Sequence, residues 1–198
     1  MDAMLAVLTL PTGPLAEACL SLARTTESAP ILDHSIRSFL YARLLAEHEG
    51  SLGDEAYDEG LLFAACILHD LGLGTGALGK ARFEVEGADL AATLLGEYGV
   101  AARDIDRVWE AIALHSSLGI AERRGLLAYL TQRGVFIDVG HETHIPLERL
   151  QVVRDTYPRP AHDRSIRDAI VEHASQSEAA APPYSIAAQL LSQKRAEG

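Results

Sequence analysis

The chain has 198 residues, of which 48% are hydrophobic and 23% are charged, a composition typical of globular proteins. Seventeen Lys and Arg against 28 Asp and Glu give a formal net charge of −11, and such an acidic surface repels nucleic-acid phosphates and anionic lipids. We therefore expect a small-molecule partner rather than nucleic acid or a membrane, and a single domain over residues 1–198.

Several features favour a cytoplasmic location. Cys19 and Cys66 lie in apolar stretches, and their spacing fits neither a metal pair nor a disulfide framework, so buried free thiols are expected. The apolar run from Ala3 to Leu10 follows Asp2, and no Lys or Arg occurs before Arg24, so a signal peptide is not expected. No segment approaches the roughly 18 consecutive apolar residues that a membrane span needs.

Hydrophobic periodicity predicts helices along almost the whole chain and no strand, so the expected fold class is all-α. The third helix contains eight consecutive apolar residues, 61–68, and is expected to be buried all round. Glycines predict a loop at 72–79. Gly134 is expected to end a helix, and the segment 134–145 is either the start of a helix or an extended turn. In chain order the expected helices are Pro14–Thr26, Asp33–His48, Asp54–Leu71, Val85–Tyr98, Asp104–Ser116, Ala121–Arg133, Ser165–Ala174 and Ile186–Gln193, with a connector at 179–183 before the last.

Two His-Asp dipeptides occur, and their surroundings differ. His162-Asp163 lies in a polar, Pro-flanked stretch where Asp163 is expected to cap a helix. His69-Asp70 instead closes the most hydrophobic helix of the chain. Burying an imidazole and a carboxylate there is costly unless both are paired, and a bound cation would satisfy both.

A metal ion needs further ligands, and two residues elsewhere qualify. His34 precedes His69 by about one helical hairpin, and Asp138 is a carboxylate among apolar residues. His34, His69, Asp70 and Asp138 are therefore the candidate ligands of one divalent transition metal per chain. Mixed His and carboxylate sets suit zinc, the expected ion, as well as Mn²⁺, Fe²⁺ and Ni²⁺.

The order His, His-Asp, Asp resembles the defining pattern of the HD-domain metal-dependent hydrolases, over roughly residues 30–140. That resemblance implies a helical bundle whose metal is held by those four side chains. Three further stretches are similar to the cyanamide hydratase-like branch: LHDLG at 68–72, RFEVEGA at 82–88 and WEAIALHS at 109–116. The branch implies hydration of a small nitrile, cyanamide, to urea at a zinc site.

Other activities of this superfamily stay open but are less favoured. The residues after Asp70 carry no Glu or Lys three positions on, unlike several nucleotide-cleaving members, and only His115 is available as an extra ligand before Asp138 for a two-metal centre. The candidate cations Arg37, Lys80 and Arg82 are few for phosphoryl transfer. The alternatives are a phosphomonoester or nucleotide phosphohydrolase and, third, a non-catalytic helical binding protein.

Apart from Asp70, the remaining candidates lie outside the set of four ligands. Asp70 or His115 would relay a proton to the substrate nitrogen, although His115 is equally typical of a core histidine. Glu84 is expected to cap a helix rather than line a pocket. His141 and His144 are expected in a solvated turn, and His48 and His173 on the surface. A homo-oligomer is left open.

Overall fold

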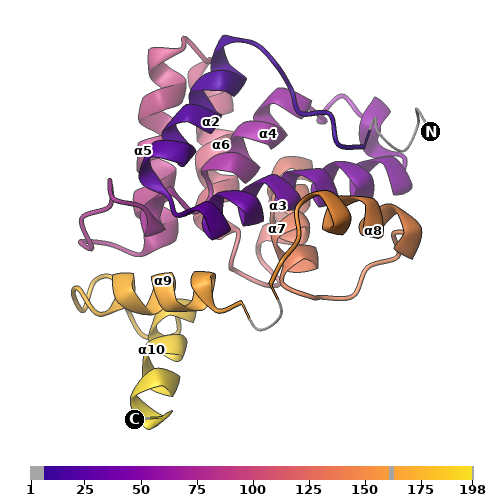
Figure 1. Cartoon of the computed structure of the whole chain (residues 1–198). Helices are drawn as coiled ribbons and strands as arrows, with labels where there is room; N and C mark the ends of the chain where they lie inside the picture. Colours follow the sequence, from indigo (N-terminus) through magenta and orange to yellow (C-terminus); the bar gives the residue numbers. More distant parts are fainter. Residues whose placement is uncertain (1–6, 161–162, 198) are drawn as a thin grey trace.

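The computed structural model describes residues 7–160 and 163–197, and all regular structure in these ranges is helical (Figure 1). This confirms the all-α fold class. No helix in the described part is both long and apolar enough to cross a lipid bilayer. The α-helices are α2 (Pro14–Thr26), α3 (Ala29–His48), α4 (Glu59–Leu68), α5 (Phe83–Glu97), α6 (Ala102–Leu114), α7 (Leu126–Asp138), α8 (Leu147–Thr156), α9 (Ser165–Ala174) and α10 (Ile186–Glu197), with short 3-10 helices η1 (Ser51–Gly53), η2 (Leu71–Leu73) and η3 (Ala121–Arg123).

The main core forms around α3 and α4. All eight apolar residues 61–68 are buried, as predicted, because α4 is covered by α2, α3, α6 and α7. Phe39 of α3 meets Phe63 of α4 edge to face, with ring centroids 4.9 Å apart. Cys19 and Cys66 are buried free thiols, which confirms their prediction. The buried α4 thereby fixes the position of the His-Asp pair that follows it.

Several helix boundaries differ from the predicted ones, and the starts of α4 and α3 have local reasons. The α4 helix begins at Glu59 rather than Asp54, because the Asp58 side chain accepts a hydrogen bond from the Leu61 N–H at 2.9 Å and caps it. It ends at Leu68, so the His-Asp pair stands in the turn beyond. The α3 helix begins at Ala29 rather than Asp33, because Pro30 occupies its first turn.

The prediction that Gly134 ends a helix is wrong. The α7 helix runs on to Asp138, and Gly134 lies at its contact with α3. A Cβ atom there would be 2.2 Å from the Ser38 carbonyl oxygen, so only glycine allows this approach. The 134–145 segment therefore starts inside a helix, and α8, which the sequence pattern did not predict, follows it.

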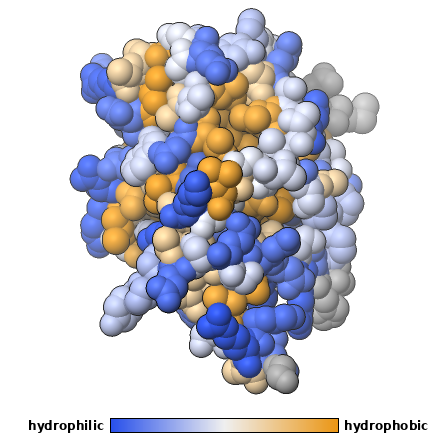
Figure 2. Space-filling view, turned by 90° about the vertical axis from the view of Figure 1, so that its left-hand side faces the viewer, coloured by the Kyte–Doolittle hydropathy of each residue, from blue (hydrophilic) through white to orange (hydrophobic). Residues whose placement is uncertain are grey.

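The last two helices, α9 and α10, lie below the rest of the bundle in Figure 1. They hold a second, smaller apolar cluster that includes Phe83, Ile170, Ala174 and Ala187. Figure 2 shows apolar residues gathered over the main bundle, with mostly hydrophilic residues over the lower part. Phe83 belongs to α5, so this cluster ties the C-terminal pair of helices to the main bundle.

We expect Gly134→Ala to lower the free energy of unfolding by about 1–3 kcal/mol, because the added methyl group meets backbone that cannot move away. Urea unfolding followed by circular dichroism measures this. Gly96→Ala is the matched control, since the nearest atom to its Cβ is 4.0 Å away, and it should gain about 0.5–1 kcal/mol. Equal stability of the two variants would contradict the close contact.

Candidate metal centre

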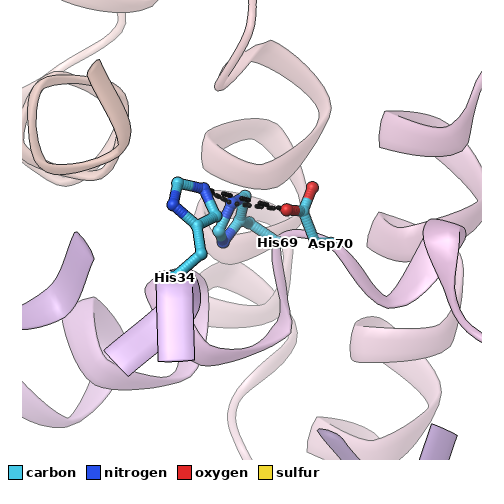
Figure 3. Close-up of side chains that lie close together, drawn as sticks. All are labelled: His34, His69 and Asp70. Carbon is cyan, nitrogen blue, oxygen red and sulfur yellow. Dashed lines mark hydrogen bonds and ion pairs between the residues drawn. The ribbon is translucent and has the colours of Figure 1, made fainter. Parts of the chain in front are cut away.

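Three of the four predicted ligands converge at one buried point (Figure 3). His34 comes from α3, and His69 and Asp70 come from the turn after α4. The Nε2 atoms of His34 and His69 are 3.2 Å apart, and Oδ2 of Asp70 lies 3.2 Å from Nε2 of His69 and 3.8 Å from Nε2 of His34. All three side chains are almost fully buried, so water does not solvate them freely.

Each imidazole is anchored at its other nitrogen. Nδ1 of His69 donates to the Cys66 carbonyl at 2.7 Å, and Nδ1 of His34 donates to Oδ2 of Asp138 at 2.6 Å. Because these partners are acceptors, the neutral rings carry their proton on Nδ1 and turn an Nε2 lone pair toward the shared point.

Two facing lone pairs repel unless a cation or a proton lies between them. Oδ2 of Asp70, beside them, is buried without a hydrogen-bond partner among the described residues. Nitrogen ligands about 2.0–2.1 Å from one ion stand roughly 3.0–3.4 Å from each other, so the observed 3.2 Å fits a shared metal. The donor set and its geometry therefore match a divalent transition metal.

The electrostatics of the site also favour a positive charge. Burial opposes a charged His69, but Asp70, the Cys66 carbonyl and Asp138 together outweigh burial and raise the pKa of His69. Burial equally opposes an ionised Asp70, yet the neighbouring histidines, His69 first, lower its pKa below the ordinary value. Asp70 is thus an ionised carboxylate in an apolar surrounding, with its charge available to a bound cation.

Asp138 contacts His34 instead of joining the group of three. Its carboxylate accepts from Nδ1 of His34 and from Nε and Nη2 of Arg37, at 2.6, 2.6 and 3.0 Å. Burial opposes its ionisation, but these hydrogen bonds bring the pKa of Asp138 down to about 2. In this structure Asp138 orients the first histidine, and its assignment as a direct ligand stays a prediction.

His115 forms a further wall of the site. Its Nδ1 donates to the Ile112 carbonyl at 2.7 Å, and its Nε2 lies 3.8 Å from Oδ1 of Asp70. Burial, together with the charge of His69, lowers the pKa of His115 to about 4, so the ring is neutral at pH 7. A neutral imidazole with Nε2 turned toward the reacting point can accept a proton there.

The prediction that Glu84 caps a helix is wrong. Glu84 does lie in the first turn of α5, but its fully buried carboxylate accepts from Ser116 Oγ at 2.5 Å and from Arg82 Nη2 at 2.7 Å. Burial opposes ionisation, but Arg82 and its other neighbours lower the Glu84 pKa. Glu84 therefore holds the residue next to His115 in place.

Glu27 is a residue that the sequence pattern did not single out. Glu27 directly follows the last residue of α2, and α3 begins two residues later. Both of its carboxylate oxygens are buried and have no hydrogen-bond partner within the described ranges. Burial and repulsion from Asp70 raise the Glu27 pKa to about 9, so it is protonated at pH 7. No sequence motif marks Glu27, so its electrostatic interaction with Asp70 becomes visible only in the folded chain.

The other histidines divide into surface and buried positions. His48, His141 and His144 are exposed, as predicted, but His141 also lines the cavity beside the three converging side chains. The surface assignment of His173 is wrong, because it is 3% exposed and its Nε2 donates to the Ala81 carbonyl at 3.0 Å. His162 lies outside the described residues. The prediction that Asp163 caps a helix is wrong, because Arg164 is the N-cap of α9, and the Asp163 carboxylate instead accepts from the N–H and Oγ of Ser165.

A cavity of about 300 Å³ opens above His34, His69, Asp70 and His115. Besides these four residues, the cavity is lined by α5, α7, α9 and α10 and by the loops next to them, and eight of these thirteen further residues are apolar. Another cavity of about 500 Å³, lined in part by Thr26, Gly74 and His173, does not include the three converging side chains. The smaller cavity is therefore the candidate substrate pocket.

The described part of the chain combines an all-α bundle with a buried His-His-Asp group at a pocket floor, an arrangement that could hold a metal ion. The family model described as HD domain matches residues 31–191, and the chain belongs to this family. No curated protein matches the sequence. Membership in the family indicates a metal-dependent hydrolase that binds a divalent metal.

We expect the stability of the metal-free protein to fall as the pH rises from about 4.5 to about 9, because the folded chain keeps the Glu27 proton that the unfolded chain loses. Glu27→Gln cannot ionise, so it should match the wild type at low pH and be more stable near the upper limit. Urea unfolding across this range measures the effect, with the exposed Glu55→Gln as control. Parallel curves for wild type and Glu27→Gln would contradict the prediction.

Asp138→Asn should weaken zinc binding by about 10–100-fold, because the substitution removes the charge that orients His34. Competition with a chromophoric chelator measures the affinity. His69→Ala should lose binding altogether, whereas Asp104→Asn, which breaks an exposed pair with Arg107, should bind zinc like the wild type. A loss with Asp138→Asn as complete as that of His69→Ala would show that Asp138 is itself a ligand.

Proposed function

We propose that this protein is a single-metal hydratase that adds water to a small, uncharged nitrile-type substrate, of which cyanamide is the simplest member and urea the product. Zinc is the proposed ion, held by His34, His69 and Asp70, with Asp138 holding His34 or completing the set. The observation that carries the proposal is the position of these ligands at the floor of an apolar pocket beside a neutral His115.

A bound divalent metal would supply a water of lowered pKa and would polarise the nitrile nitrogen. The protein residues do the rest. Nε2 of His115 accepts a proton from the attacking water as its oxygen bonds to the nitrile carbon, and then delivers that proton to the nitrogen. This gives isourea, which becomes urea when its hydroxyl proton moves to the nitrogen. Asp70, whose Oδ1 is 3.8 Å from this Nε2, stabilises the imidazolium that forms in between.

The surroundings favour this substrate over a phosphate ester. Phosphoryl transfer requires Arg or Lys side chains that neutralise the charge on the transferred group. Arg37 is engaged with Asp138, and Arg82 with Glu84. A non-catalytic binding protein is a weaker reading still, because such a protein has no need of converging ligands and an orphaned carboxylate oxygen.

Protein purified without chelator should carry about one metal ion per chain by elemental analysis and release urea from cyanamide. His115→Ala should lower kcat by about 10²–10⁴-fold while the metal content stays unchanged. His48→Ala, an exposed histidine, is the matched control and should keep full activity. Phosphate release from nucleotides or p-nitrophenyl phosphate without urea formation would replace the proposal with a phosphohydrolase, and a chain that takes up no metal on reconstitution would contradict both.

A further inference from the structure

The walls of the pocket come from two distant parts of the chain. One side is formed by α5 and α7, and the other by α9 and α10, whose residues lie far from the motif in sequence. Together they surround the ligands with aliphatic and aromatic side chains. The main apolar wall residues are Phe83, Val135, Phe136, Ile166, Ile170 and Leu190.

The pocket is larger than the simplest nitrile requires. Cyanamide has three non-hydrogen atoms, and at about 30 Å³ each, the share of one water molecule in the liquid, they fill at most about 90 Å³. The cavity measures about 300 Å³. Roughly two thirds of it would remain filled only by water against apolar walls, which is unfavourable.

The cations at the pocket already have partners. Arg167 pairs with Glu197 at 2.8 Å, and Nη1 of Arg159 donates to the Asp138 carbonyl at 2.9 Å. Asp163 also lines the pocket, and hydrogen bonds from Ser165 and then the charge of Arg159 lower its pKa, so it adds an ionised carboxylate to the wall. Together with the carboxylates of Asp70, Asp163 and Glu197, these two arginines leave the described wall residues without a net positive charge for an anionic substrate group.

We infer that the substrate carries an uncharged apolar body of several carbon atoms, seated between α7 and the α9–α10 pair, with its reacting C–N group directed at His34, His69 and Asp70. The inference rests on the proposed function and names its substrate class. The residues of α9 and α10 then select the substrate, while the motif residues act on it.

Zinc-loaded protein and a series of straight-chain hydroxamates test this inference, because the hydroxamate head binds the metal and the tail probes the walls. Isothermal titration calorimetry from acetohydroxamate to hexanohydroxamate should show affinity rising up to about fourfold per added methylene. A hydroxamate of similar length that ends in a carboxylate, such as succinic monohydroxamate, should bind more weakly than the uncharged one.

A matched pair of neighbouring leucines localises the effect. Leu190 lines the pocket, whereas Leu191 packs in the same apolar cluster but lines a different cavity. Leu190→Ala should flatten the dependence on chain length, and Leu191→Ala should leave it unchanged. The series on the unmodified protein needs neither variant, so a folding defect in one of them does not affect the main result.

The outcomes separate the two proposals. Measurable binding of acetohydroxamate with no gain for longer tails overturns the apolar body and leaves the metal-dependent hydratase standing. Tighter binding of the carboxylate-ended compound overturns the uncharged character of the substrate. If no hydroxamate binds to protein that also retains no zinc, the proposed function fails and the inference fails with it.

Discussion

The site depends on hydrogen bonds that fix Nδ1 of each imidazole. His69 and His115 stand at the C-terminal ends of α4 and α6, and each ring turns back to donate to a carbonyl of the last helical turn, those of Cys66 and Ile112. The last carbonyls of a helix lack the usual intrahelical partner. The histidine N–H therefore gives the carbonyl a hydrogen bond, and the carbonyl fixes the orientation of the ring. This hydrogen bond, which both His69 and His115 make, turns both Nε2 atoms toward Asp70. His34 has no free carbonyl within α3 and needs an acceptor from elsewhere.

That acceptor, the carboxylate of Asp138, comes from α7 and reaches His34 across 104 residues of sequence. The two helices approach so closely because Gly134 carries no side chain toward Ser38. A carboxylate buried beside one neutral imidazole would cost stability, and Arg37, one turn after His34, supplies the compensating charge. A packing constraint in the core therefore sets the orientation of a metal-binding ring.

The features that could be predicted are those that leave a pattern among neighbouring residues of the sequence. Helical periodicity and the unbroken apolar run 61–68 depend on neighbouring residues, so the fold class and the burial of α4 were predictable, as was the convergence of His34 on the His-Asp pair. Contacts between distant segments leave no such pattern. Glu84 holds Ser116, and His173 is buried against the 79–81 loop, only because separate elements meet. The same holds for Glu27 beside the metal-binding group.

The net charge of −11 acts on a ligand at long range, whereas the pocket residues act on it at contact distance. The acidic surface disfavours anionic ligands at a distance, and inside the pocket the charges of Arg159 and Arg167 are balanced by the carboxylates of Asp70, Asp163 and Glu197. Both effects point to an uncharged substrate. Phe83 connects this selectivity to the chemistry, because its ring lies 5.5 Å from that of His115 and also packs in the cluster of α9 and α10. A change in the C-terminal wall can therefore alter the shape of the pocket beside the proposed proton acceptor without touching a metal-binding residue.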